Sequence, residues 1–328
     1  MNLPIVSTPD TSPPSQLDGP SGCWLADWGL LRISGADAAN FLQGQCTADI
    51  QALAHGSLGC GAFCTPKGRV FANVRLARWE NDFYLMLPRE LVAPLQKRLQ
   101  LYVLRAKVTM EDLSGDQSML GVLGLNADVT LRHAGFEIPA KGRFAVPVDT
   151  SPAILSLPDD PNRFILIFSE NRDSAPKLTQ ALAFVHSETW QLGEIAAGFP
   201  WVTLETSEEF LPQMINLDWL DGIGFNKGCY TGQEIVTRTH YLGQLKRRMF
   251  RLQGKGNFCP TPGKVIYDVN GSEPKSAGHV VNACPIDAER FECLAVLNLE
   301  QADNPTLRAG TPEGPLLGKL PLPYSPTD

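Results

Sequence analysis

The sequence lacks a long apolar run, a Cys-x-x-Cys pair and any basic residue before Arg32. No apolar run approaches the roughly 20 residues that a membrane-spanning helix needs. A signal peptide needs a basic start ahead of an apolar stretch, and a mitochondrial presequence needs arginines on an amphipathic helix. The first residues show neither pattern, so we expect a cytoplasmic protein with no membrane partner, in which residues 1–20 form a flexible polar arm.

The eight cysteines lack the dense spacing of a secreted disulfide framework, which indicates a reducing compartment. Cys60 and Cys64 are four residues apart in a predicted strand, so their side chains lie on one face. A metal pair would have this spacing, but buried cysteines that pack as small apolar side chains explain it more simply. Four of the five histidines show no metal-ligand spacing among themselves, and we predict no permanently bound metal.

A positive net charge is also absent, since the formal net charge is −7. Such a surface repels nucleic acid at long range, so direct nucleic-acid binding is not expected. One local exception consists of Lys246, Arg247 and Arg248, with Arg251 just beyond. Exposed strand edges are commonly protected by basic residues, and a solvated strand edge is the simplest explanation of this cluster.

Length and composition indicate a globular protein of two or three domains. The chain has 328 residues, of which 43% are hydrophobic and 19% charged. Residues 21–115 predict a first α+β lobe with strands over 24–26, 30–33, 58–65, 69–79, 83–87 and 107–113. Ser34 and Asp37 offer a capping box for a helix between the second and third of these strands. Pro88 suits the first turn of another helix, which buries Leu91, Val92, Leu95 and Leu99.

The order of hairpin, helix and strand recurs in residues 116–243, which predicts a second, related α+β lobe. A hairpin is expected from 154–157 and 164–168, a helix around 175–185, and a closing segment over 190–197. Residues 244–328 change in character, because short strand-like runs alternate with turn residues. Asn270-Gly271 between apolar runs predicts a hairpin, and this end is expected to form an antiparallel β-barrel.

The most informative segment is KGCYTGQE, residues 227–234. Thr231 and Glu234 have the spacing of a capping box, which predicts a helix from about Gly232. Cys229 would then precede a helix N-terminus, and the helix dipole and Lys227 would both favour its thiolate. This pattern describes a reactive cysteine exposed at a turn. A buried structural cysteine in a glycine-containing turn is the alternative.

The chain resembles the YgfZ family over roughly residues 24–300. KGCYTGQE is similar to the family signature, and LPQ at 211–213 precedes it at the usual distance. Residues 31–49, LRISGADAANFLQGQCTAD, are similar to the opening strand and helix of the family. Residues 63–70, FCTPKGRV, resemble its early hairpin, and GHVV at 278–281 lies where a strand of the terminal barrel should be.

This resemblance implies the fold of the glycine cleavage T-protein, an aminomethyltransferase. Three domains would form a ring around a folate pocket, namely the two α+β lobes and the C-terminal barrel. Glu194 falls where the T-protein holds the pterin with a carboxylate, which can pair with two adjacent N–H donors. Asn73, Tyr230 and Gln233 complete the residues expected to bind tetrahydrofolate or a related folate.

One position departs from the T-protein pattern. Asn73 stands where the T-protein carries its catalytic Asp, and an uncharged amide can neither act as a base nor offset a cationic transition state. Enzymatic activity is therefore left open. A folate-dependent one-carbon (aminomethyl) transferase is the first alternative function, and RNA binding through the basic cluster at 246–251 is the second.

The function that the resemblance implies is that of a folate-binding accessory factor for iron–sulfur enzymes, among them enzymes that modify tRNA. Cys229 would be its working residue, with Lys227 tuning the thiol. The expected partners are a folate and the iron–sulfur client enzymes, and the protein is expected to be a monomer.

Overall fold

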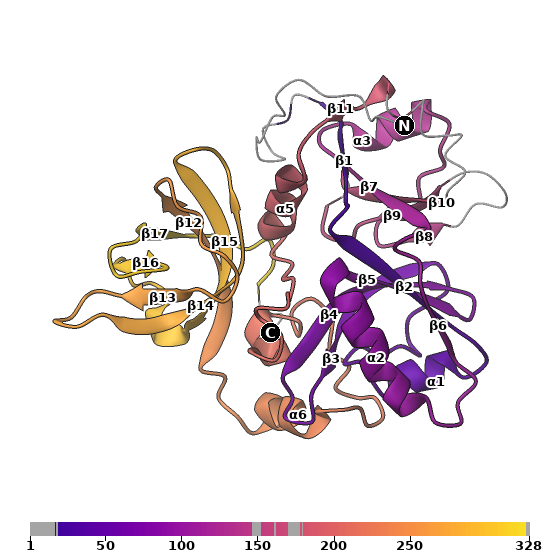
Figure 1. Ribbon diagram of the computed structural model, residues 1–328, viewed down its shortest axis with the longest axis horizontal. Coiled ribbons are helices and arrows are strands. Elements are labelled where there is room, and N and C mark those ends of the chain that lie inside the picture. Colours follow the sequence, from indigo (N-terminus) through magenta and orange to yellow (C-terminus); the bar gives the residue numbers. More distant parts are fainter. Residues whose placement is uncertain are drawn as a thin grey trace.

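The computed structural model describes residues 17, 19–145, 152–160, 162–169, 178 and 180–325. Its strands form three sheets, and helix α5 (Ser187–Ala196) lies between the third sheet and the other two (Figure 1). Mixed helices and sheets confirm the α+β class. The expected arm at residues 1–20 falls almost entirely outside the described residues. The helix predicted around 175–185 lies partly outside them, and its end was wrong, because β11 (Ala183–Phe184) is a strand.

The first sheet has the strand order β3-β4-β5-β2-β6. Its strands are β2 (Trp28–Ser34), β3 (Ser57–Cys64), β4 (Val70–Trp79), β5 (Asp82–Pro88) and β6 (Thr109–Asp112). Helix α2 (Val92–Val103) follows a 3-10 turn, η2 (Arg89–Leu91), and buries the predicted apolar side chains. Helix α1 (Ala38–Gln43) forms without the predicted capping box, because the Asp37 carboxylate accepts a hydrogen bond from the Lys107 amide at 2.8 Å.

The second sheet has the order β11-β1-β7-β10-β9-β8. The predicted hairpin is confirmed, and α3 (Ala127–His133) packs beside the sheet. The strands are β1 (Ser21–Trp24), β7 (Gln117–Leu123), β8 (Phe144–Ala145), β9 (Ala153–Ser156), β10 (Phe164–Ser169) and β11 (Ala183–Phe184). Two expectations were wrong. Strand β1 pairs with β7 and β11 and not within the first lobe, and the predicted closing strand at 190–197 is helix α5.

The third sheet is antiparallel with the order β16-β13-β14-β15-β12-β17. The hairpin at Asn270-Gly271 is confirmed, since it joins β13 to β14. Strand β12 pairs with β15 along its length but with β17 only at 251–254. Among the described strands, Arg247 and Arg248 are therefore paired on one side only, as the strand-edge explanation expects, whereas Arg251 is paired on both sides. The bounds are β12 (Arg247–Lys255), β13 (Val265–Asp268), β14 (Lys275–Pro285), β15 (Arg290–Asn298), β16 (Leu307–Ala309) and β17 (Leu317–Leu320), with η4 (Leu299–Gln301) after β15.

The largest core joins the first and third sheets and positions the site. Phe63 and Leu85 from the first sheet, Ile195 from α5, and Val281 and Leu294 from the third sheet belong to one buried apolar cluster. The connection between α5 and β12 crosses this core. It carries η3 (Pro212–Ile215) and α6 (Gln233–Tyr241).

Within the described part of the chain, every helix is too short or too polar to cross a lipid bilayer.

Candidate functional site

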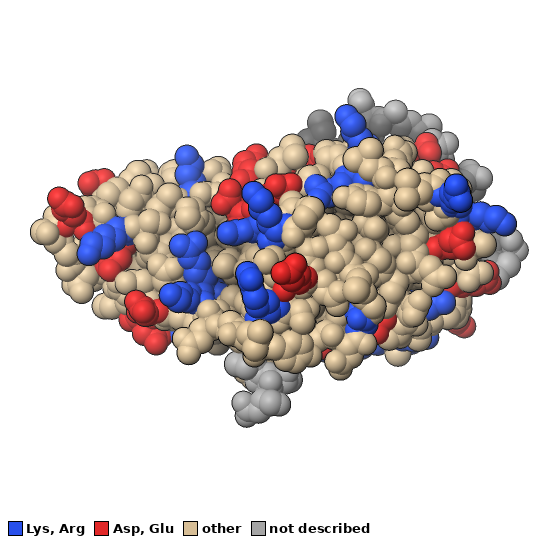
Figure 2. Space-filling view, turned by 90° about the horizontal axis from the view of Figure 1, so that it is seen from below, with Lys and Arg blue, Asp and Glu red and all other residues tan. Residues whose placement is uncertain are grey.

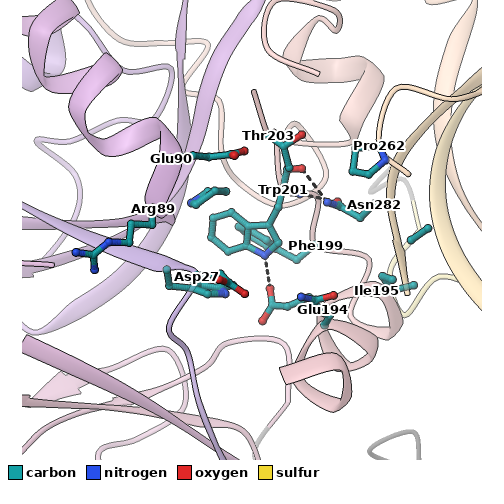
Figure 3. A pocket seen from close by; sticks show the side chains of 14 residues that line it. Asp27, Arg89, Glu90, Glu194, Ile195, Phe199, Trp201, Thr203, Pro262 and Asn282 are labelled. Carbon is teal, nitrogen blue, oxygen red and sulfur yellow. Dashed lines mark hydrogen bonds between the residues drawn. The ribbon is translucent and has the colours of Figure 1, made fainter. Parts of the chain in front are cut away.

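A cavity of about 640 Å³ lies where the first sheet, α5 and the third sheet meet. Its wall is largely apolar and aromatic (Figure 3). Trp28 lies at the start of β2, Phe199 and Trp201 follow α5, and Asn282 comes from β14. The rings of Trp28 and Trp201 meet edge to face with centroids 4.2 Å apart, and Phe199 lies 4.9 Å from Trp201. A cavity of this size with aromatic walls is typical of a site for a flat organic molecule.

Glu194, to which the resemblance assigns the pterin-binding carboxylate, lies at the cavity wall. Its side chain is almost fully buried and carries three hydrogen bonds. Oε2 accepts from Arg75 and from the Trp201 indole, both at 2.8 Å, and Oε1 accepts from Arg163. A carboxylate oxygen offers about two acceptor positions, so Oε1 retains one for a further donor. The bidentate pairing expected with a pterin would require Oε2 to release Arg75 or Trp201.

Asp159 completes a buried network with the two arginines. It contacts Arg75 at 3.5 Å and Arg163 through a second ion pair. Burial alone would raise the pKa of Asp159, but Arg75 and Arg163 hold that pKa below its usual value. Arg75 also stacks over Phe199, with the guanidinium carbon 3.9 Å from the ring centroid. The network therefore fixes both Glu194 and an aromatic wall of the cavity.

Asn73 lies behind the cavity wall and does not line it. Its side chain is fully buried in β4, where Nδ2 donates to the Pro200 carbonyl at 2.7 Å and Oδ1 accepts from the Val202 amide at 2.8 Å. Both polar atoms of the amide are therefore bound to the segment that carries Trp201.

Cys229 is exposed at a separate groove of about 610 Å³. Tyr230 and Gln233 line this groove together with Cys229, although the sequence assigned them to the folate site. The 640 Å³ cavity and this groove have no lining residue in common. The predicted site residues thus fall into two places, with Glu194 at the cavity and Cys229, Tyr230 and Gln233 at the groove.

Lys227 binds the first lobe. Its ammonium donates to the carbonyl oxygens of Cys46 at 2.8 Å and Ala48 at 2.6 Å, and it lies 5.0 Å from the centre of the Tyr230 ring. Burial lowers the pKa of Lys227. Burial also raises the pKa of Tyr230, whose hydroxyl lies in the interior. Among the described residues no hydrogen bond joins Lys227 to Cys229. The lysine instead ties the loop that carries Cys229 to the backbone of residues 46–48 in the first lobe.

The predicted capping box at α6 is not formed. The helix begins at Gln233, its N-cap is Gly232 with φ of 86°, and the Thr231 hydroxyl contacts Oε1 of Gln45 at 3.4 Å. A Cβ at Gly232 would lie 2.5 Å from the Thr65 carbonyl oxygen and 3.0 Å from the Gly68 Cα. The turn at 65–68 therefore packs directly against the helix start, and this close approach requires glycine.

Replacement of Gly232 by Ala should lower the free energy of unfolding by about 2 kcal/mol or more, because a left-handed backbone and a clash with Thr65 would coincide. Urea denaturation measures this change. Gly228→Ala in the same loop is the matched control, since a Cβ there meets no atom within 4 Å. Equal stability of the two variants would contradict the packing argument.

Two of the four residues in the basic cluster are paired with carboxylates. Arg248 pairs with Asp218 through both terminal guanidinium nitrogens and stacks on Trp219, while Arg251 pairs with Glu292. Figure 2, which views the molecule from the side of α6, shows Lys and Arg near the middle of this face with Asp and Glu among them. This arrangement weakens the case for RNA binding through the cluster.

The aromatic wall was missed by sequence analysis. Trp28, Trp201 and Asn282 are far apart in the chain, and neither hydrophobic period nor a local motif marks them. Only the packing of the first sheet against the third brings them together.

The fold defines the class of the protein. The chain superimposes on the glycine cleavage system aminomethyltransferase T of Bartonella henselae with a TM-score of 0.76, at 15% identity, over 92% of this chain and 84% of that one. Residues 25–139 match the family described as the GCVT N-terminal domain. The fold is therefore that of the glycine cleavage T-protein.

Two relatives identify the family within this class. The tRNA-modifying protein YgfZ of Yersinia enterocolitica is 34% identical over 309 residues, which cover 93% of this chain and 92% of that protein. The protein of the same name from Yersinia pestis is 33% identical over 306 residues, 92% of this chain and 91% of that protein. The chain belongs to the YgfZ family.

Proposed function

We propose that this protein is a folate-binding accessory factor for iron–sulfur enzymes, including enzymes that modify tRNA. The observation that carries the proposal is the aromatic cavity with Glu194 at its wall, in a chain of the YgfZ family. The relatives are named as tRNA-modifying proteins, which connects the family to that process.

The cavity fits a folate. Trp28, Phe199 and Trp201 offer ring faces and edges to a flat pterin, and Oε1 of Glu194 can accept one further N–H. Asp27 adds an exposed carboxylate to the lining. A bound reduced folate would supply a carrier of one-carbon groups, while the chain orients its ring and shields it from water. The buried amide of Asn73, whose nitrogen and oxygen each bind the backbone, gives no support to the alternative of an aminomethyl transferase.

Cys229 is the proposed working residue, because its thiol is exposed in a groove while most other cysteines are buried. We assign Lys227 the role of holding its loop. Gln233 and Tyr230 are proposed to shape the approach to the thiol. Client iron–sulfur enzymes would dock over this groove, and the protein would act in the cytoplasm as a monomer.

The arrangement of domains is part of the proposal. Three domains would form a ring around the cavity, namely residues 21–115, 116–243 and 244–328. Strand β1 belongs to the first range but pairs within the sheet of the second. The cavity supports this division, because its lining comes from the first sheet, α5 and the third sheet. Closure of the third sheet into a barrel is supported by the hydrogen bond from the Ala309 amide to the Pro315 carbonyl at 3.0 Å.

Titration with 5-formyltetrahydrofolate, a stable reduced folate, tests the cavity directly. We expect wild-type protein to bind it and Trp28→Leu to bind about tenfold more weakly, since one ring contact is worth about 1–3 kcal/mol. Calorimetry measures both affinities. Trp79→Leu is the control, because Trp79 packs against His55 and Phe144 outside the cavity. Absence of binding to the wild type would refute the proposed folate site.

A further inference from the structure

Two asparagine side chains hold the backbone on either side of Trp201. From β4 in the first sheet, Asn73 binds the Pro200 carbonyl at 2.7 Å and the Val202 amide at 2.8 Å. From β14 in the third sheet, Asn282 accepts from the Trp201 amide at 2.7 Å and donates to the Trp201 carbonyl at 2.9 Å. Two sheets thus hold one short segment through four hydrogen bonds.

The same segment is anchored at its start. The Tyr324 hydroxyl donates to the Gly198 carbonyl at 2.6 Å, and Gly198 has a φ of 66°. A Cβ at Gly198 would lie 2.7 Å from the Tyr324 ring, so this contact also requires glycine. The backbone from 198 to 202 is therefore held from several directions, while the Trp201 ring projects into the cavity wall (Figure 3).

The chemistry of the contacts accounts for an amide at position 73. An amide carries a donor and an acceptor on one carbon, as the Pro200 carbonyl and the Val202 N–H require, which belong to the two peptide groups flanking Trp201. An ionised carboxylate of the same shape accepts only, so it would oppose the Pro200 carbonyl oxygen in a site from which water is excluded. Asn282 meets the same requirement from the other side.

We propose that Asn73 and Asn282 are positioning residues, which fix the Trp201 ring so that the first and third sheets jointly set the affinity of the cavity for a flat ring. Neither residue needs to take part in chemistry. The proposal rests on the proposed folate site for its ligand. It also predicts a property of the free protein, namely a fixed orientation of the Trp201 indole.

Near-UV circular dichroism of the free protein tests that orientation. The Trp201 contribution is defined as the difference between the wild type and Trp201→Phe. We expect Asn73→Ala and Asn282→Ala each to lose most of this difference band while the far-UV spectrum is retained. Asn298→Ala is the matched control, because Asn298 accepts from Arg247 at the end of β15, away from the cavity, and should keep the band.

Binding of 5-formyltetrahydrofolate, measured by calorimetry, tests the consequence. Each single variant should bind about tenfold more weakly than the wild type. Since both amides hold one segment, the double variant should lose less than the product of the two single effects. Full additivity, or wild-type affinity in both single variants, would overturn the proposal. If Asn73→Ala does not fold, the test rests on Asn282→Ala alone: a wild-type Trp201 band and wild-type affinity in that variant would overturn the proposal.

The two proposals can fail separately. If the wild type binds no folate but the Trp201 band depends on both asparagines, the folate site is wrong and the positioning role stands. If the wild type binds folate and neither asparagine affects the band or the affinity, the positioning role is wrong and the folate site stands.

Discussion

Cells that lack this protein should recover thiolated tRNA when they express the wild type and should fail to do so with Cys229→Ser. The hydroxyl of Ser has nearly the shape of the thiol but cannot act as a thiolate nucleophile or a soft metal ligand. Because Cys229 is exposed, the exchange removes no buried contact. We expect tRNA thiolation to fall to the level of the deletion strain, measured by mass spectrometry of digested tRNA.

Cys259→Ser is the matched control, since Cys259 is a partly exposed cysteine in the third part of the chain, away from the groove. It should restore thiolation as the wild type does. Equal rescue by Cys229→Ser would reduce Cys229 to a structural residue and leave the pathway intact. Failure of the wild type to rescue would count against the iron–sulfur role itself.

Replacement of Glu194 by Ala should cost about 3–5 kcal/mol of unfolding free energy, the range for removing one partner of a buried ion pair. Glu194 accepts from Arg75, Arg163 and Trp201, and both arginines are buried. Without it, only Asp159 would remain to balance two buried guanidinium groups. Urea denaturation with matched fluorescence and circular dichroism measures the loss.

Glu188→Ala on the same helix is the control. Glu188 is partly exposed, and its contact with His186 at 3.9 Å should contribute little. We expect a change below about 0.5 kcal/mol there. A similarly small change for Glu194→Ala would show that the buried network does not hold the cavity wall.

Local periodicity was enough to predict many of the elements. The apolar spacing of Leu91, Val92, Leu95 and Leu99 indicated α2. Val92, Leu95 and Leu99 form its buried side, and Leu91 is buried in the preceding turn η2. The turn at Asn270-Gly271 located a hairpin of the third sheet. These signals are local, because one element or one turn contains all the residues that decide them.

Both predicted capping boxes were wrong for the same physical reason. The Asp37 carboxylate bonds to the Lys107 amide, and the Thr231 hydroxyl contacts Gln45. In each case the side chain contacts a partner distant in sequence: Asp37 accepts from a distant backbone amide, whereas Thr231 donates to the side-chain oxygen of Gln45. At α6 the close approach of Gly232 to the turn at 65–68 fixes the helix start instead. Caps of short helices at lobe interfaces are therefore poorly determined by local sequence.

The candidate site was predicted in part. The glycines around Cys229 indicated an exposed thiol, and the structure exposes it. Lys227 was predicted to favour the thiolate of Cys229, whereas its ammonium bonds to the carbonyl groups of residues 46 and 48. The Trp201 wall and Asn282 depend on contacts between sheets, which no local pattern encodes.

The insertion of β1 into the second sheet has a consequence for synthesis on the ribosome. Strand β1 is among the first elements to emerge, but its neighbours are β7 and β11, and β11 begins at Ala183. Domains generally fold as units during synthesis, from the N-terminal end onward. Here β1 cannot pair with β11 until more than half of the chain has been translated, so the second sheet is completed late. Only then can the cavity wall that follows α5 be assembled.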